Sequence, residues 1–271
     1  MIVVRRFLHA YVESGPKGLC AAIYRKVTRP LRRSPGSAVD GGSPLVDGAG
    51  AAVQDKVVPS VHPFDMEYGT DTSGLISGEE LVSGRWNDLW NTAYYGISPS
   101  GFDQMLQPLD LEWERFTFVD MGSGKGRALL LASRFPFKRI VGVEIAPELS
   151  KRAEANIERF SAPWQRCREI EVRTGDAAEF AYPAGPLVLF LYQPFLAPVL
   201  KRCMKNFACS LAAEPREVYV VYVNPVFERL MERVPGLARL WERSFAYSDE
   251  DLKADRVGAK GDRVVVYRYL P

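Results

Sequence analysis

The stretch F-T-F-V-D-M-G-S-G-K-G-R, from Phe116 to Arg127, decides the fold of this chain. An apolar run ends at Asp120, a glycine-rich turn follows, and a helical pattern begins at Ala128. Glycines occur at such a strand–turn–helix junction because the turn is tight and because a ligand must approach the backbone itself. We therefore expect the first strand of a parallel sheet here, with a ligand site at its carboxyl end.

Beyond this stretch, apolar runs alternate with helical patterns, which is typical of a parallel sheet with crossover helices. The predicted strands are near-continuous apolar runs: Phe116–Asp120, Arg139–Glu144, Glu169–Thr174, Leu187–Tyr192 and Glu217–Val223. Two further strands, Leu240–Tyr247 and Arg263–Tyr269, are joined by a polar loop that shows no helical pattern. These patterns predict an α/β fold: a doubly wound, seven-stranded, mostly parallel sheet with a C-terminal antiparallel hairpin and helices on both faces.

Composition divides the chain into four parts. Residues 1–33 carry eight Lys and Arg against Glu13 alone, with apolar residues at helical spacing, and predict a basic amphipathic arm. Residues 34–55 are rich in Gly, Ser, Ala and Pro, the composition of a flexible linker. Residues 56–114 are predicted to form a helical pre-domain or lid, and residues 115–271 a Rossmann-like domain.

Charge and cysteine content restrict the class of protein. The net charge is +2, but because the arm is so basic the rest of the chain is acidic and lacks the basic face that nucleic acid requires. Four Cys and two His show no metal-ligand spacing, so no metal is predicted. No apolar run reaches the roughly 18 to 20 residues that a membrane span needs. We expect a cytoplasmic protein whose arm either lies on an anionic membrane surface or docks on its own domain.

The glycine-rich turn does not match a phosphate-binding loop. In the dinucleotide pattern G-x-G-x-x-G/A the third position would be Arg127, and here the third glycine comes one residue early, at Gly126. The phosphate-binding lysine motif is also absent, since Lys125 is followed by glycine. The carboxylate of Asp120 at the strand end would repel a pyrophosphate. It suits a ligand such as S-adenosylmethionine, which carries an ammonium and a sulfonium but no phosphate.

Two further carboxylates follow the next two predicted strands. Glu144 ends the second strand 18 residues after Gly126, where an acid can accept hydrogen bonds from ribose hydroxyls. Asp176 follows the third strand, where a carboxylate can accept from the exocyclic amine of adenine. Because the carboxyl ends of parallel strands share one edge of the sheet, the three acids are expected to meet there.

The motifs V-D-M-G-S-G-K-G, V-G-V-E-I and G-D-A resemble those of class I S-adenosylmethionine-dependent methyltransferases, over about residues 115–271. The resemblance implies that Asp120 and the glycine loop hold the methionine end of the cofactor, Glu144 the ribose and Asp176 the adenine. The cofactor-binding residues implied in this way are Asp120, Gly122, Ser123, Gly124, Gly126, Glu144, Ile145, Asp176 and Ala177.

The fourth strand ends in L-F-L-Y-Q-P-F, which is similar to the N/D-P-P-Y/F motif of amino-group methyltransferases, with Gln193 in place of Asn or Asp. That resemblance implies an amide and a backbone carbonyl that hold an amine beside an aromatic ring. Upstream, Tyr94 to Pro99 is similar to the segment that precedes the first motif in non-SET lysine methyltransferases. The candidate acceptor-site residues are Tyr95, Tyr192, Gln193, Pro194 and Phe195.

These features favour an S-adenosylmethionine-dependent methyltransferase that acts on nitrogen, in a protein lysine or a small-molecule amine, by in-line methyl transfer. Two alternatives remain open: a small-molecule O- or C-methyltransferase, and a non-catalytic module that binds S-adenosylmethionine. The sequence does not identify the methyl acceptor. A nucleic-acid acceptor is not expected, because the body of the chain is acidic.

Overall fold

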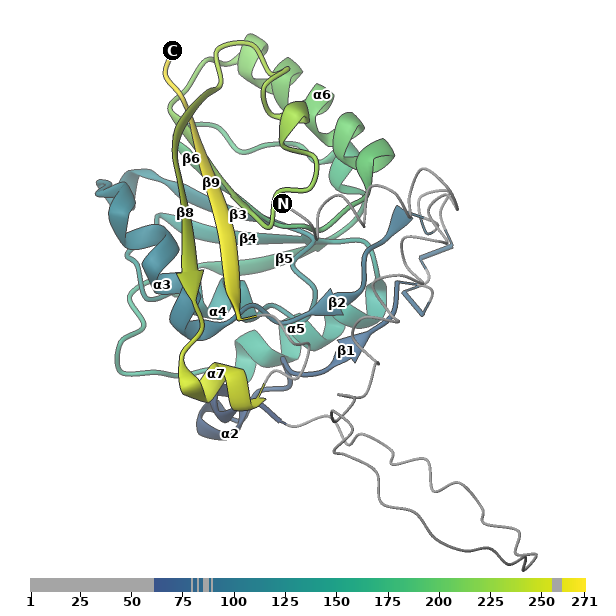
Figure 1. Cartoon of the computed structure of the whole chain (residues 1–271), viewed down its shortest axis with the longest axis vertical. Helices are drawn as coiled ribbons and strands as arrows, with labels where there is room; N and C mark the ends of the chain where they lie inside the picture. The colour runs from purple at the N-terminus through teal and green to yellow at the C-terminus, as the bar shows by residue number, and fades with distance from the viewer. Residues whose placement is uncertain (1–60, 79, 82, 85–87, 89, 255–259) are drawn as a thin grey trace, which may run out of the picture.

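The computed structural model describes residues 61–271, apart from 79, 82, 85–87, 89 and 255–259. The predicted arm (1–33) and linker (34–55) lie outside the described residues. The described chain is built on one seven-stranded sheet with helices on both of its faces (Figure 1). The predicted fold class is therefore confirmed.

The strand order across the sheet is β5-β4-β3-β6-β7-β9-β8, and only β9 and β8 run antiparallel to their neighbours. The strands are β3 (Thr117–Met121), β4 (Arg139–Glu144), β5 (Ile170–Thr174), β6 (Leu187–Tyr192), β7 (Val218–Val223), β8 (Ala238–Ala246) and β9 (Gly261–Tyr269). The chain moves outward from β3 to β5, then crosses back and continues outward from β6. The carboxyl ends of β3 and β6 therefore flank the point where the order reverses, which is where open α/β sheets bind ligands.

Alternate side chains of each central strand enter two separate cores. From β3, Phe118 packs on one face with α3 (Pro99–Leu106) and α4 (Arg127–Ala132), whereas Val119 and Met121 pack on the other face with α6 (Ala197–Ala213). Helix α5 (Pro147–Arg159) contacts β4 and β5. It begins with Pro147, at a position where the backbone N–H that proline lacks would have no acceptor within the helix. Short 3-10 turns are η2 (Gln107–Leu109), η3 (Trp113–Arg115), η4 (Ala177–Glu179) and η5 (Glu228–Leu230).

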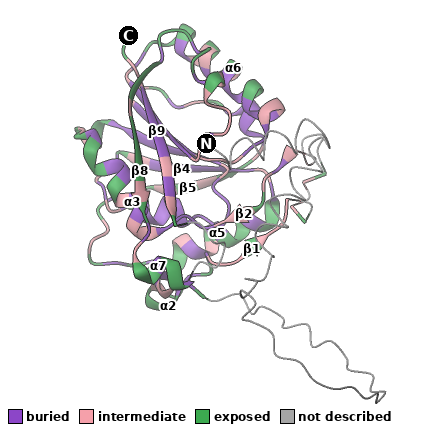
Figure 2. Ribbon diagram, in the orientation of Figure 1, coloured by how far each residue is buried: buried purple, intermediate pink, exposed green. Residues whose placement is uncertain are grey.

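Two expectations about the sheet were wrong. Strand β5 is not an apolar run buried on both sides: it lies at the sheet edge, and its residues are intermediate or exposed (Figure 2). Glu171 and Arg173 form an exposed ion pair on it. Charged side chains on an edge strand discourage pairing with other chains. The connection between β8 and β9 is not purely a loop, since it contains the helix α7 (Asp249–Ala254).

The segment that precedes the sheet contains α2 (Pro63–Tyr68) and a two-stranded pair of β1 (Leu75–Ile76) with β2 (Tyr94–Tyr95). His62 begins α2, and its Nδ1 accepts from the N–H of Phe64 at 3.0 Å. Its Nε2 therefore carries the proton and donates to Asp251 of α7 at 2.9 Å. Ser98 and Ser100 also donate to Asp251, so the start of the described chain is fastened to the C-terminal hairpin.

Candidate functional site

A pocket lies at the carboxyl edge of the sheet, over the point where the strand order reverses. Its floor is formed by Asp120 and the glycine loop that follows β3. One side is formed by Glu144 and Asp176, and the opposite side by the segment around β2 and the residues that follow β6. The predicted site residues on its wall are Tyr95, Asp120, Gly122, Ser123, Gly124, Glu144, Ile145, Asp176, Ala177, Tyr192, Pro194 and Phe195. Gly126 and Gln193 are the two that do not line it.

The glycine loop keeps its shape because two of its positions admit no side chain. Gly122 has φ +86°, and a Cβ there would lie 2.6 Å from Cβ of Pro194. Gly124 has φ +53°, and its Cβ would lie 2.3 Å from the ring of Tyr94. The loop thus needs the left-handed conformation that glycine adopts without strain, and it also packs directly against two walls of the pocket.

Asp120 is a buried carboxylate without a compensating donor. It is 3% exposed, and within the part of the chain that the structure describes no group donates a hydrogen bond to it. Burial, reinforced by the nearby charge of Glu144, raises the pKa of Asp120 to about 8. A cation that entered the pocket would relieve both effects, because it would provide the opposite charge that the carboxylate lacks.

Glu144 is equally buried but is held by the backbone. One carboxylate oxygen accepts from the N–H of Gly124 at 2.8 Å, and the other accepts from the N–H of Ala146 at 2.9 Å. Burial raises the pKa of Glu144, and these N–H groups oppose the rise because they stabilise the charged form. Glu144 therefore also fixes the glycine loop, and its three backbone hydrogen bonds, which include one from Ile145, leave one acceptor position for a ligand.

Asp176 and Ser123 complete the polar side of the pocket. Asp176 caps η4 by accepting from the N–H of Ala178 at 2.8 Å, and its second oxygen accepts no hydrogen bond from another described residue. Ser123 Oγ is buried and also lacks a partner among the described residues. Buried polar atoms are seldom left unpaired in proteins, so the second oxygen of Asp176 marks a position where a polar ligand fits. Ser123 Oγ faces Gly142 on β4, where an added Cβ would lie 2.6 Å from it.

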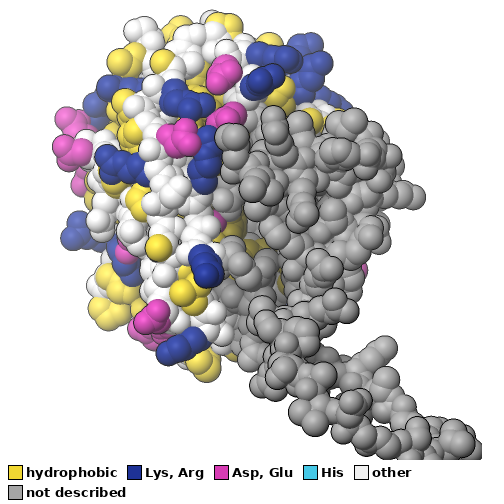
Figure 3. Space-filling model, viewed as in Figure 1, with side chains coloured by type: hydrophobic (Ala, Val, Ile, Leu, Met, Phe, Trp, Pro, Cys, Tyr) yellow, Lys and Arg dark blue, Asp and Glu magenta, His cyan; other side chains and the backbone are white. Residues whose placement is uncertain are grey.

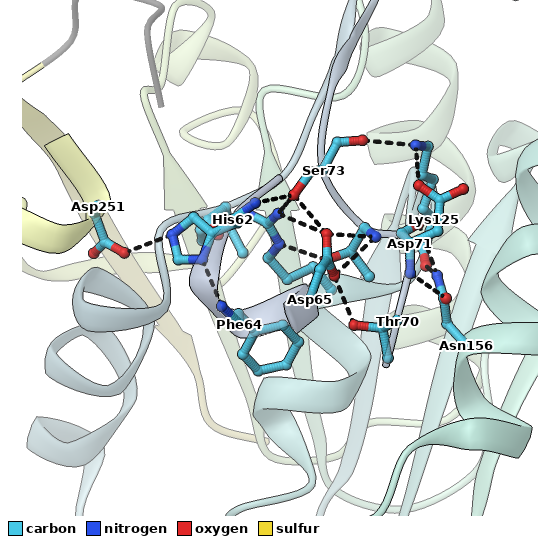
Figure 4. Close-up of polar contacts among 12 residues, drawn as sticks. His62, Phe64, Asp65, Thr70, Asp71, Ser73, Lys125, Asn156 and Asp251 are labelled. Atoms are coloured by element: carbon cyan, nitrogen blue, oxygen red, sulfur yellow. Dashed lines mark hydrogen bonds and ion pairs between the residues drawn. The ribbon is translucent and has the colours of Figure 1, made fainter. Parts of the chain in front are cut away.

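Behind the glycine loop, a buried polar cluster joins the loop to residues 70–73 (Figure 4). Lys125 Nζ donates to Asp71 at 2.9 Å and to the carbonyl of Ser73 at 2.6 Å. The side-chain oxygen of Asn156 on α5 accepts a hydrogen bond from the N–H of Asp71 at 2.8 Å. The side-chain nitrogen of Asn156 donates to the carbonyl of Lys125 at 2.9 Å. The cationic residue of the loop therefore points away from the pocket.

Arg127 and Asp65 form the centre of this cluster. Arg127 is 2% exposed, and its guanidinium donates to Thr72 Oγ1 at 2.7 Å and lies 3.7 Å from the carboxylate of Asp65. Burial alone would raise the pKa of Asp65, but hydrogen bonds from Ser73, Thr70 and Thr72 outweigh it, and the pKa is lowered. Residues 70–73 are not among the residues that line the pocket. They support the loop from behind.

The residues after β6 form the wall expected to face a methyl acceptor. Tyr192, Pro194 and Phe195 line the pocket, together with Tyr95 from β2. Gln193 has φ +42°, a conformation that costs a non-glycine residue energy. The Pro194 carbonyl, expected to hold an amine, accepts from Thr92 Oγ1 at 3.0 Å.

The contribution of residues 91–97 to the pocket was largely missed from sequence. Of these residues only Tyr95 is among the predicted site residues, although the resemblance to non-SET lysine methyltransferases points to the segment from Tyr94 to Pro99. The other residues that line the pocket are Asn91, Thr92, Ala93, Tyr94, Gly96 and Ile97. Asn91 pairs with Phe195 across an isolated β-bridge, which brings this segment against the loop that follows β6. No local sequence pattern encodes a contact across about a hundred residues. The available signals were the pair of adjacent tyrosines and the resemblance of Tyr94 to Pro99 to a known segment.

One protein-family model matches part of the chain. Residues 85–175 match the model of the family described as histone methylation protein DOT1. No curated protein matches the chain. The strand order, the glycine loop with its acidic neighbours and this match together define the class: the chain is a Rossmann-like, S-adenosylmethionine-dependent methyltransferase. The prediction of the enzyme class is confirmed.

Several solved structures are similar in part. Geranyl diphosphate C-methyltransferase from Streptomyces coelicolor is 12% identical, with 62% of this chain and 76% of that chain covered and a TM-score of 0.42. A putative sarcosine dimethylglycine methyltransferase from Galdieria sulphuraria is 14% identical, with 64% and 85% covered and a TM-score of 0.43. TrmN from Thermus thermophilus is 16% identical, with 64% and 49% covered and a TM-score of 0.44.

The pocket suits S-adenosylmethionine on chemical grounds. The cofactor has cationic groups near its methionine end, and Asp120 offers an uncompensated carboxylate. It carries ribose hydroxyls and an exocyclic amine, which are hydrogen-bond donors, and Glu144 and Asp176 offer acceptors.

Among the described residues no cluster of His, Cys, Asp or Glu could hold a metal ion. No helix within the described ranges is long and apolar enough to cross a membrane.

Proposed function

We propose that this methyltransferase binds S-adenosylmethionine along the carboxyl ends of β3, β4 and β5 and transfers its methyl group to an amine nitrogen. Asp120 would pair with the ammonium, Glu144 would accept from the ribose hydroxyls, and Asp176 would accept from the adenine amine. The observation that carries this proposal is the pocket itself, which is lined by three carboxylates that follow three neighbouring strands. The backbone of Gly122 to Gly124 would approach the methionine end of the cofactor.

The remaining cofactor-site residues fit this arrangement. Ser123 has a buried hydroxyl without a partner in the described chain, and Ile145 and Ala177 supply apolar walls beside Glu144 and Asp176. Gly126 lies outside the pocket but has φ +87°, and it allows the chain to turn from the loop into α4. Its role would be to position the loop rather than to touch the cofactor.

The aromatic wall supports an amine acceptor. Tyr95, Tyr192 and Phe195 surround the part of the pocket that lies beyond the glycine loop, and aromatic rings stabilise a nitrogen that gains positive charge. Gln193 and Pro194 would shape this wall through the backbone, since Gln193 does not line the pocket and the Pro194 carbonyl is bonded to Thr92. Because Gln193 is withdrawn from the pocket, a small-molecule O- or C-methyltransferase stays the second candidate.

The mechanism needs little chemistry from the protein. When bound, S-adenosylmethionine supplies a methyl group already activated by the sulfonium. The residues of the pocket then have to align an acceptor with that methyl group and exclude water. An amine acceptor must lose a proton, either to water or to a general base, before its nitrogen can attack the methyl group. The buried floor and the aromatic wall of the pocket would exclude water from the acceptor and from the methyl group.

Calorimetric titration of S-adenosylmethionine and of S-adenosylhomocysteine into the full chain tests the cofactor site. We expect micromolar binding by the wild type and at least a tenfold loss in Asp120→Ala. Glu148→Ala serves as the control, because Glu148 lies on α5, is exposed, and among the described residues forms an ion pair with Lys151 alone. Absence of binding in the wild type, or equal binding in both variants, would contradict the proposed site. Incubation with a panel of amines, alcohols and activated carbon acids then separates N-directed from O- and C-directed transfer.

A further inference from the structure

The chain leaves β6 through a residue in a strained backbone conformation. Gln193 has φ +42°, which lies in the left-handed region where the Cβ of an ordinary residue crowds the backbone. The neighbouring strand β7 ends in the same way, because Asn224 follows it with φ +50°. Asparagine tolerates this conformation better than glutamine does. The turn after β6 therefore needs support from outside its own sequence.

That support comes from a side chain about a hundred residues upstream. Thr92 Oγ1 lies 3.1 Å from the carbonyl oxygen of Gln193 and 3.0 Å from that of Pro194, so its one proton serves two acceptors. Close by, the N–H of Leu196 donates to the carbonyl of Trp90 at 3.1 Å. These contacts fasten the turn after β6 to the segment that leads into β2.

The fastened turn lies directly on the glycine loop. A Cβ at Gly122 would lie 2.6 Å from Cβ of Pro194, so these two residues are in close contact. Gly124 makes the corresponding contact with the ring of Tyr94, only two residues beyond Thr92. The short segment from Thr92 to Tyr94 thus acts on both glycines, on one through Pro194 and on the other directly.

We propose that Thr92 is a positioning residue for the cofactor: its hydroxyl holds the strained turn so that Pro194 stays seated on Gly122. The inference rests on the proposed function, since the glycine-loop backbone is the part that would approach the methionine end of the cofactor. Because coupling between two sites is reciprocal, a bound cofactor also fastens the turn after β6. The glycine loop and the wall that follows β6 therefore behave as one unit.

The test is calorimetric titration of S-adenosylhomocysteine into the full chain and its variants. Thr92→Val keeps the shape of the side chain and removes the hydroxyl, so we expect affinity to fall about fivefold, as for the loss of one hydrogen bond. Thr92→Ser restores the hydroxyl and should bind within about twofold of the wild type. Thr117→Val is the matched control, because Thr117 is 2% exposed and begins β3, at the end of the strand away from the glycine loop.

A second background separates support of the turn from a direct contact with the ligand, since Thr92 also lines the pocket. Gln193→Asn places after β6 the residue type that the chain uses after β7, and this turn needs less support. In that background we expect Thr92→Val to weaken binding by no more than about twofold, so that the two substitutions are not additive. A direct contact between Thr92 and the ligand would cost the same in both backgrounds.

The wild type alone offers a further measurement. Leu196 is not among the residues that line the pocket, but its N–H is bonded to the carbonyl of Trp90. Saturation with S-adenosylhomocysteine should slow hydrogen exchange of this amide about fivefold, because a bound ligand fastens the turn. Near-ultraviolet circular dichroism shows that each variant used in the titrations is folded.

The possible failures are distinguishable. If the wild type binds S-adenosylhomocysteine and Thr92→Val binds it as tightly as Thr117→Val does, the inference is overturned and the cofactor site stands. Equal losses from Thr92→Val in both backgrounds, or unchanged exchange of the Leu196 amide, would overturn it as well. If the wild type does not bind S-adenosylhomocysteine, the proposed cofactor site fails together with the inference.

Discussion

Binding of the cofactor should release a proton from Asp120. This carboxylate has a pKa of about 8 in the free protein, because it is buried and lies near Glu144. At pH 7 it is therefore about 90% protonated. Once an ammonium lies beside it, the charged form is favoured, so binding should release about 0.9 proton at pH 7 and very little at pH 9. The same linkage strengthens the affinity by about 50-fold between pH 6 and pH 8.

The assay is calorimetric titration of S-adenosylhomocysteine in two buffers with different ionisation enthalpies. The difference in observed heat gives the number of protons released. Asp120→Asn is the control, since it keeps the size of the side chain and leaves the titration of the ligand's own amino group unchanged. A wild type that releases no more protons than Asp120→Asn at pH 7 would refute the reasoning, because the carboxylate would then be charged already in the free protein.

The free protein offers a second measurement of the same group. The folded state holds the proton of Asp120 up to about pH 8, whereas the unfolded chain releases it near the ordinary value of 3.8. The contribution of Asp120 to stability is thus fully present below pH 3.8 and is lost as the pH rises toward 8. Urea unfolding between pH 5 and pH 8 should show a decline in the wild type that Asp120→Asn lacks; parallel profiles would argue against the raised pKa.

Three further substitutions test the supports of the site. Asp65→Ala removes the partner of a buried guanidinium and should lower the free energy of unfolding by about 3–5 kcal/mol, measured in urea, whereas Glu148→Ala on the surface should change it by less than about 0.5 kcal/mol. Gly124→Ala should lower the free energy of unfolding and should weaken the affinity for the cofactor more than tenfold. Gly175→Ala, whose added Cβ meets no atom within 4 Å, should leave the free energy of unfolding nearly unchanged. Gln193→Gly should raise the unfolding free energy by about 1 kcal/mol by relieving its positive φ, and a loss of stability would show that the side chain itself is needed.

The sequence predicted the sheet well because its central strands are apolar on both faces. The predicted bounds of β4 and β6 agree with the structure to the residue, since each run is framed by a turn signal at both ends. Strand β5 was wrongly predicted to be buried on both faces, because its two charged residues, Glu171 and Arg173, indicate an edge strand. The helix α7 was missed although its signals are present: Ser248 caps it, and acidic residues fill its first turn.

The candidate site could be predicted only where it is local in sequence. The acids after β3, β4 and β5 could be placed because parallel strands share an edge, and the structure brings them into one pocket. The interactions of Lys125 and Arg127 with residues 71–73 could not be foreseen, since these partners lie more than fifty residues upstream. The hydrogen bond from Tyr247 to Asp262 was likewise hidden, because it depends on the register in which β8 pairs with β9.

The buried cluster around Asp65 also bears on where a stable fragment of this chain can begin. A fragment that started at residue 115 would contain every motif of the cofactor site, yet Lys125 and Arg127 would lose their partners Asp65, Asp71 and Thr72 and the segment that buries them. It would also leave Asp251 without His62. The segment from His62 onward is thus an integral part of the catalytic body rather than an appendage. Any minimal version of this enzyme, or any transplant of its site into another scaffold, has to carry that segment along.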